Sequence, residues 1–400
     1  MIHAKGVSPR AFPYNNDRDP EQIDRLQNIG EDFSANKEKA YEIGRTGRLG
    51  FKKGTQTFAY SATQLEYGSM AFWYDIANKE DPESVDDHYI DLDDLAYKQT
   101  TIAVFKVDDN ATFRGTTVYQ GLRVNGFSVN IGAPDAAIDR SFDLIGEKYE
   151  TLDAKYFSFQ KATAAGATLN IVLSPVAIEY ASAKYILKVL RVRSGVVSEL
   201  VEGTDFTYTS GTATVAISGC SVGDICKVYY PSDTAYTTTW ADNDVDPDLL
   251  LAEYAEIRLK VGVSTRIYRL QSVGIDVSFD RADYGEIGNS EKILFGVNDK
   301  TVTVSLNKYN ENLTLEDILA SDTAYPYVDA SNLAENIQMQ VLIYDNKAHT
   351  GAIKIGYLIS GLSPTTLGSS QDIQAYNQGT FSLESDNLKI SDDVTDLAFA

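Results

Sequence analysis

The feature that most limits what this chain can fold into is an internal duplication. The segment IDRLQNIGEDFSANKEKAYEIG (residues 23–44) aligns without a gap with IYRLQSVGIDVSFDRADYGEIG (residues 267–288). Ten of the 22 positions are identical, whereas unrelated segments would share about one or two. Self-similarity at a fixed offset of this strength predicts two copies of one structural unit.

The match between the two copies continues downstream at lower identity. LRVNGFS at 122–128 resembles YLISGLS at 357–363, and SFDL at 141–144 resembles TFSL at 380–383. The predicted organisation is therefore an N-terminal arm (1–22), a first copy (23–150), a connector (151–266), a second copy (267–390) and a C-terminal tail (391–400).

Both copies show the alternation of apolar and polar residues that is typical of half-buried antiparallel strands. It is clearest over 127–131, 275–279 and 301–306. Each copy also contains one helical pattern, at roughly 64–78 and at 313–320. We therefore expect a mainly β (α+β) fold, with two tandem β-sandwich or barrel domains that each carry one helix.

The connector contains short strand patterns separated by Gly and Ser turns, at about 176–238. This spacing predicts a small inserted β-sandwich module. The two cysteines of the chain, Cys220 and Cys226, lie in it, and we interpret them as reduced core residues. Because an insertion is tolerated at a surface loop, we expect the module to lie on the outside of any assembly.

The sequence contains none of the common catalytic motifs, and it has only three histidines. We therefore expect no enzymatic activity and no cofactor. One acidic stretch has the spacing of a calcium loop, with Asp242, Asp244, Asp246 and Glu253 at positions one, three, five and twelve. Its sixth position, which should be glycine, is Pro247, so a solvated acidic linker is the expectation and calcium binding the alternative.

Charge and hydropathy exclude two further classes of protein. The formal net charge is −22, which disfavours a basic clamp for nucleic acid. No stretch approaches the ~18 consecutive apolar residues of a membrane-spanning helix, so we expect no membrane partner.

Residues 42–96 contain the candidate contacts between subunits. A glycine-rich basic stretch is followed by an aromatic cluster, and bulky aromatics outside an alternating pattern are interface candidates. The candidates are Arg45, Arg48, Lys52, Lys53, Phe72, Trp73 and Tyr74. The alternative for the three aromatic residues is that they cover the core-facing side of the predicted helix.

Two segments carry a resemblance to a known family. EIGRTGRLGFKKGTQTFAYSATQLEYGSMAFWYDIAN (42–78) resembles the major tail tube proteins of tailed bacteriophages, and VNGFSVNIGAPDAAIDRSFDLIGEKYETL (124–152) is similar to later strands of that family. The resemblance extends over both copies and implies a structural protein. Such a protein forms rings in which neighbouring sheets join, and the rings stack into a tube through which the genome passes without specific binding.

The resemblance also implies partners and a location. Rings of this family present six domains, so a chain with two copies is expected to form trimers that make a pseudo-hexameric ring. The alternative is six chains with one copy outside the ring. Expected partners are other copies of the chain and tail proteins such as sheath, baseplate or tape-measure protein. The expected location is the tail of the virion, after assembly in the host cytoplasm.

Two other classes of structural protein fit the same features. One is a different ring-forming component of a tail, a baseplate or an injection system, and the other is a β-rich protein that binds cell surfaces.

Overall fold

The computed structural model describes most of the chain. The described residues are 2–14, 20–23, 25–34, 37–41, 48–53, 57–77, 79, 89–108, 112–132, 134–182, 184–234, 249–261, 263–266, 270–285, 292–309, 336–370 and 378–399.

The elements of the first copy are β1 (Ile2–Pro13), β2 (Glu21–Gln22), β3 (Leu26–Ser34), β4 (Lys37–Tyr41), β5 (Arg48–Lys53), β6 (Thr57–Leu65), α1 (Ala71–Ala77), β7 (Ile90–Asp91), α2 (Leu92–Tyr97), β8 (Thr100–Asp108), β9 (Phe113–Ile131), β10 (Asp139–Gly146) and β11 (Lys148–Asp153). The elements of the module are β12 (Tyr156–Thr163), β13 (Thr168–Val172), β14 (Lys188–Arg193), β15 (Val196–Glu199), β16 (Phe206–Thr209), the 3-10 helix η2 (Ser210–Thr212), β17 (Thr214–Ser218) and β18 (Ile225–Ser232). The elements of the second copy are the 3-10 helix η3 (Ala252–Tyr254), β19 (Ala255–Val261), β20 (Val263–Arg266), β21 (Leu270–Gly285), β22 (Lys292–Tyr309), β23 (Ile337–Tyr344), β24 (Ile353–Ser370), β25 (Gln378–Ser385) and β26 (Asn387–Ser391).

The fold is mainly β, as expected, and the two copies have the same strand pairing. In the first copy β1 pairs with β2 and β8, β8 with β9, β9 with β10 and β11, and β6 with β3 and β10. In the second copy β19 pairs with β20 and β23, β23 with β24, β24 with β25 and β26, and β22 with β21 and β25. Each strand of the first set therefore has a counterpart in the second.

Irregularities in the strands give the residue-by-residue correspondence. The pairing of β3 skips Gln27 and that of β21 skips Gln271, as the alignment at an offset of 244 requires. Gly121 in β9 and Gly361 in β24 both have positive φ, +65° and +73°, which fixes an offset of 240 for these strands. The sequence match of 122–128 with 357–363 is therefore wrong by five positions.

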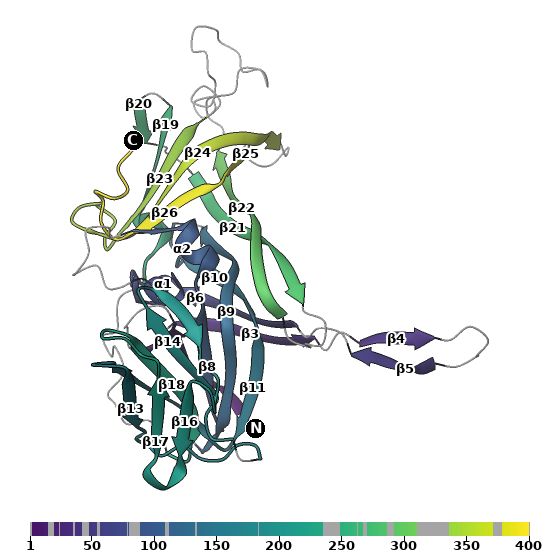
Figure 1. Cartoon of the computed structure of the whole chain (residues 1–400). Coiled ribbons are helices and arrows are strands. Elements are labelled where there is room, and N and C mark those ends of the chain that lie inside the picture. The colour runs from purple at the N-terminus through teal and green to yellow at the C-terminus, as the bar shows by residue number, and fades with distance from the viewer. Residues whose placement is uncertain are drawn as a thin grey trace.

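A single sheet joins the two copies. The second half of β9 pairs with β21, from Ile131 opposite Val273 to Gly126 opposite Ser278. The resulting sheet has the order β3–β6–β10–β9–β21–β22–β25–β24 and is called the shared sheet below. The first halves of β9 and β24 belong to two smaller outer sheets, one per copy, so each long strand passes from an outer sheet into the shared sheet (Figure 1).

The main hydrophobic core lies between the shared sheet and the outer sheets and runs through both copies. From the first copy it includes Phe127 and Phe142, and from the second Val277 and Val304. The helix α1 packs into the same core. Because one continuous core spans the joint, the two copies hold each other in place.

The inserted module is a sandwich of a four-stranded sheet (β12–β18–β14–β15) on a three-stranded sheet (β13–β17–β16) with its own core. It begins with β12, upstream of the expected start at about 176. Cys220 and Cys226 are buried and not bonded to each other, with their sulfur atoms 3.9 Å apart.

The module packs on the outer face of the first outer sheet, away from the shared sheet. Phe12 of β1 meets Phe157 of the module edge to face, with ring centroids 5.0 Å apart. The buried Lys227 Nζ donates a hydrogen bond to the Pro13 carbonyl (2.6 Å). In the second copy the same face of the outer sheet is covered instead by the C-terminal segment, where Leu397 is buried against Leu342 and Leu358.

Two expected elements differ in the structure, and a third cannot be compared because it lies outside the described residues. The helix expected at 64–78 is shorter, because residues up to Leu65 continue β6 and α1 starts at Ala71. The expected N-terminal arm is largely β1, which pairs with β8. The helix expected at 313–320 lies outside the described residues. Among the described residues, no helix is long and apolar enough to span a membrane.

Candidate assembly surfaces

A basic hairpin extends away from the body of the molecule. Within the described part of the chain, the strands β4 and β5 pair only with each other, from Lys37 opposite Lys53 to Tyr41 opposite Arg48. They project from the ends of β3 and β6 (Figure 1). Residues 37–53 contain six basic and two acidic residues in a chain whose net charge is −22. The candidates Arg48, Lys52 and Lys53 lie on β5, and Arg45 lies outside the described residues.

The three aromatic interface candidates are in the core, which corrects their assignment to a surface. Phe72, Trp73 and Tyr74 are 4%, 0% and 4% exposed. Trp73 meets Phe127 and Phe142 edge to face, with centroids 4.8 and 5.2 Å apart. They therefore cover the core side of α1, because burying such large apolar surfaces stabilises the monomer itself.

The calcium candidate is only partly described. Asp242, Asp244 and Asp246 lie outside the described residues. Glu253 lies in η3, where its carboxylate pairs with Lys347 Nζ at 2.6 Å. Among the described residues, no group of three or more potential metal ligands occurs.

One face of the shared sheet is open and polar. Its strands alternate, so that Phe127, Ile275 and Val304 point into the core while their neighbours point away from it. The outward residues, called the open face below, are Ser61, Thr63, Ser128, Asn130, Ser141, Asp143, Asp276, Ser278, Thr301, Thr303, Ser305, Ser382 and Glu384. These positions hold hydroxyls, one amide and carboxylates, and no lysine or arginine.

The open face continues across the joint between the copies without interruption. Ser141 lies opposite both Thr63 and Ser128, and the hydroxyl oxygens of Ser128 and Ser141 are 2.6 Å apart. The row continues into the second copy because Asp276 lies opposite Ser128. Partial burial raises the pKa of the Asp276 carboxyl above its ordinary value.

As far as the structure describes the chain, the shared sheet has one free edge in each copy. β3 pairs on one side with β6, and the second half of β24 pairs on one side with β25. Among the described residues, the other side of each strand has no partner. Unpaired backbone N–H and C=O groups along a strand edge are a template for another strand.

Side-chain hydrogen bonds and an ion pair link the two copies across the joint. Arg281 of β21 donates hydrogen bonds to the carbonyl oxygens of Val124 (Nε, 3.0 Å) and Ala96 (Nη2, 2.9 Å). Its burial lowers the pKa of the guanidinium to about 10. Lys300 Nζ pairs with Asp93 of α2 at 2.6 Å.

A second strand contact crosses the joint. β7 adds to the edge of β26, with Ile90 opposite Ile390 and Asp91 opposite Lys389. α2 follows directly and starts with a capping box, in which Asp91 accepts from the Asp94 backbone N–H (2.9 Å) and Asp94 accepts from that of Asp91 (3.1 Å). The sequence analysis did not predict this helix.

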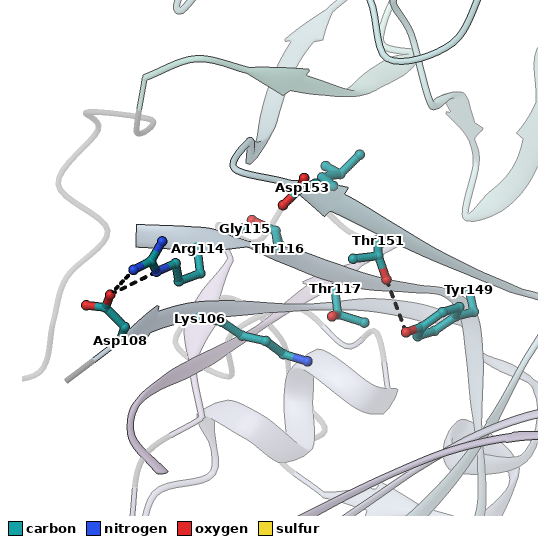
Figure 2. Close-up of a pocket in the computed structure, with 10 residues that line it drawn as sticks. Lys106, Asp108, Arg114, Gly115, Thr116, Thr117, Tyr149, Thr151 and Asp153 are labelled. Carbon is teal, nitrogen blue, oxygen red and sulfur yellow. Dashed lines mark hydrogen bonds and ion pairs between the residues drawn. The ribbon is translucent and has the colours of Figure 1, made fainter. Parts of the chain in front are cut away.

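An open cavity of about 430 Å³ lies in the first copy at the ends of β8, β9 and β11 (Figure 2). Figure 2 shows Arg114 paired with Asp108 and Thr151 donating to the Tyr149 hydroxyl (3.1 Å). Lys106 also lines the cavity and pairs with Glu31 at 2.8 Å. The lining therefore holds paired charges and hydroxyls.

The comparisons with known proteins find similarity to parts of contractile injection systems. One similar chain belongs to an extracellular contractile injection system, in the PVC sheath–tube complex in its extended state. It is 18% identical, with a TM-score of 0.28 over 39% of this chain and 99% of that chain. Another belongs to the baseplate of the anti-feeding prophage, with 10% identity and a TM-score of 0.25 over 36% of this chain and 91% of that chain. No protein-family model and no curated protein matches the sequence.

Proposed function

We propose that this protein is the structural subunit of a phage-type tail tube, whose rings stack into a conduit for genome ejection. The observation that carries the proposal is the shared sheet, which already joins two copies of one domain edge to edge and leaves one free edge in each copy. The resemblance of residues 42–78 and 124–152 to tail tube proteins supports the same assignment.

We use the pairing of β9 with β21 inside the chain as the template for the pairing between chains. β3 is the counterpart of β21 and β24 is the counterpart of β9, so β24 of one chain pairs with β3 of the next. Applying the two offsets to the β9–β21 register places Thr366 opposite Ser34, Gly368 opposite Asp32 and Ser370 opposite Gly30. This pairing removes both free edges when the ring closes.

We propose three chains per ring, as the duplication leads us to expect. Eight strands from each of three chains make 24, and at ~4.8 Å spacing and ~40° tilt these form a barrel about 48 Å across between backbones. Six chains would double this width. Because β9 pairs directly with β21, the structure favours both copies in the wall over one copy outside it.

We infer the positions of the other parts of the chain in this ring from the order of the layers. The open face of the shared sheet lines the channel, where hydroxyls and carboxylates offer no cation to a passing polyanion. The module lies on the far side of the first outer sheet, so it decorates the outer surface. The basic β4–β5 hairpin reaches the acidic body of a copy in the next ring.

The experiment is disulfide cross-linking combined with electron microscopy. Ser34→Cys and Thr366→Cys in one chain should cross-link between chains, giving covalent trimers on a denaturing gel and rings or tubes in negative stain. Each variant with only one of the two substitutions is the matched control, because it keeps the buried Cys220 and Cys226, and it should give no ladder. A protein that remains monomeric at high concentration, with no cross-link, would contradict the proposal.

The closest alternative function is another ring-forming component of a tail, a baseplate or an injection system. The same joints would form there, but the rings would not stack. Tubes of many rings, assembled by the purified chain alone, distinguish the proposed function from this alternative.

A further inference from the structure

The strand contact between β7 and β26 has a counterpart position in the first copy that is vacant among the described residues. β11 corresponds to β26 at an offset of 239, so Thr151 corresponds to Ile390 and Glu150 to Lys389. β11 pairs with β9 on one side, and its other edge has no partner within the described part of the chain. Thr151 is exposed, whereas Ile390 is 1% exposed beneath β7.

The side chains around this edge differ between the copies in a consistent way. Ile343, Tyr357, Leu388 and Ile390 of the second copy belong to the dry core. Their counterparts in the first copy are Lys106, Thr117, Tyr149 and Thr151, which line the 430 Å³ cavity of Figure 2. In the second copy, β7 covers the edge of β26. At the corresponding place in the first copy, beside the edge of β11, there is an open polar cavity.

The second copy contains a sequence counterpart of β7 and α2. Residues 89–96 read YIDLDDLA and residues 327–334 read YVDASNLA, with identical Tyr, Asp, Leu and Ala at an offset of 238. Val328 takes the place of Ile90 and Asp329 that of Asp91. Residues 327–334 lie outside the described residues.

We propose that the free edge of β11, with the cavity beside it, is a docking site for residues 327–334 of the adjacent copy of this chain. Val328 lies opposite Thr151 and Asp329 opposite Glu150, as Ile90 and Asp91 lie opposite Ile390 and Lys389. This inference rests on the proposed ring, and it adds a second strand contact to each joint between chains.

The polar lining of the cavity is what we expect at a contact that forms only when two chains associate, because such a surface is exposed to water in the free chain. An apolar surface such as that of Ile343, Leu388 and Ile390 would be exposed in the free chain and would promote aggregation. Threonines and paired charges remain hydrated until the neighbouring segment arrives. The intrachain joint is closed on folding, so its apolar contacts are never exposed in this way.

The test is disulfide formation at the predicted register in the full chain. A chain with Thr151→Cys and Val328→Cys should cross-link between chains and give covalent trimers under mild oxidation with glutathione disulfide. A second in-register pair, Glu150→Cys with Asp329→Cys, should behave in the same way if the first pair perturbs folding. The matched control is Thr151→Cys with Ser331→Cys, which is three positions out of register and should give no ladder.

The outcomes separate this inference from the proposed function. Cross-links at 151/328 or 150/329 together with those at 34/366 support both. Cross-links at 34/366 without either in-register pair at β11 overturn the docking site and leave the ring intact. Loss of all cross-links, with a monomeric protein, overturns both.

Discussion

Arg140 Nη1 lies 3.0 Å from Glu66 Oε2, and both side chains are completely buried. Glu66 Oε1 also accepts the backbone N–H groups of Tyr67 and Gly68, each at 3.0 Å. The backbone carbonyl of Glu66 accepts a hydrogen bond from the Leu250 N–H (3.1 Å). This bond links the first copy to the segment that leads into the second copy. This ion pair therefore lies where the chain enters the second copy.

Removing the arginine should strongly destabilise the monomer. Arg140→Met leaves the Glu66 carboxylate buried without its cation, and breaking a buried pair in this way costs about 3–5 kcal/mol. Denaturant unfolding of the purified chain measures the loss. Lys347→Met removes the exposed partner of Glu253 and should leave the free energy of unfolding almost unchanged. Equal losses for the two variants would contradict the prediction.

The two kink glycines should differ in their sensitivity to alanine. Both have positive φ, so Gly361→Ala should cost roughly 1 kcal/mol from backbone strain. Gly121→Ala should cost more, because the new Cβ would clash with the Glu147 carboxylate. Gly132→Ala, where nothing lies within 4 Å of the added carbon, is the control. Thermal unfolding gives the order, and a larger effect at Gly361 than at Gly121 would refute it.

The module should lose stability in acid through Asp224. Hydrogen bonds from Arg193 (Nη2, 2.6 Å) and from the Ser221 backbone N–H (2.7 Å) lower the pKa of Asp224 to about 2. A carboxyl whose folded pKa is depressed stabilises the fold above its unfolded pKa of about 3.9 and loses that contribution as the pH falls towards 2. Melting temperatures measured from pH 5 to pH 2 should fall more for the natural protein than for Asp224→Asn. Parallel curves would rule out this role.

The C-terminal segment should act as a cover on the second outer sheet. Leu397→Asp places a charge against Leu342 and Leu358, which detaches the segment and exposes the apolar patch beneath it. We expect increased binding of a hydrophobic dye and concentration-dependent association in ultracentrifugation. Val394→Asp, at a side chain that is 51% exposed, is the control and should behave like the natural protein. Unchanged dye binding by the Leu397 variant would refute the covering role.

Lysines on the open face should make assembled tubes retain DNA. Asn130→Lys with Ser278→Lys adds two cations to a surface of hydroxyls and carboxylates, at exposed positions where stability should change by less than about 0.5 kcal/mol. Salt-sensitive protection of duplex DNA from nuclease would show binding inside the tube. Val196→Lys with Val222→Lys adds the same charge to the module and should give no protection. Equal protection in both variants would contradict a channel lined by the open face.

The duplication was predictable from the sequence because turn and bulge residues repeat with it. The Arg-Leu-Gln stretch contains the bulged Gln27 and Gln271, and a bulge needs a specific residue pattern. The correspondence of β9 with β24 was not predictable in the same way. Two strands with alternating apolar and polar residues can be aligned in several registers with similar scores. In this case either Gly121 or Gly126 of β9 can be aligned with Gly361, and only the backbone conformation shows that Gly121 is the counterpart.

The candidate surfaces were predicted less well than the fold, for a physical reason. The basic hairpin stands out in the sequence as a local run of charge, whereas the free edges depend on which strands lack a partner, which only the tertiary pairing shows. α2 had a local signal in the capping box of Asp91 and Asp94, which our sequence analysis did not use. The burial of Trp73 depends on Phe127 and Phe142, which are far from it in sequence.

The β9–β21 pairing also affects the order of events during synthesis. Ile131 leaves the ribosome well over a hundred residues before its partner Val273, a delay of roughly 10–30 s at typical elongation rates. During this time the edge of β9 has no partner within its own chain and is open to the β3 edge of any finished neighbour. If chains join as we propose, we therefore expect translation speed and the spacing of ribosomes on the messenger to influence how much of the protein joins incorrectly before the second copy is complete.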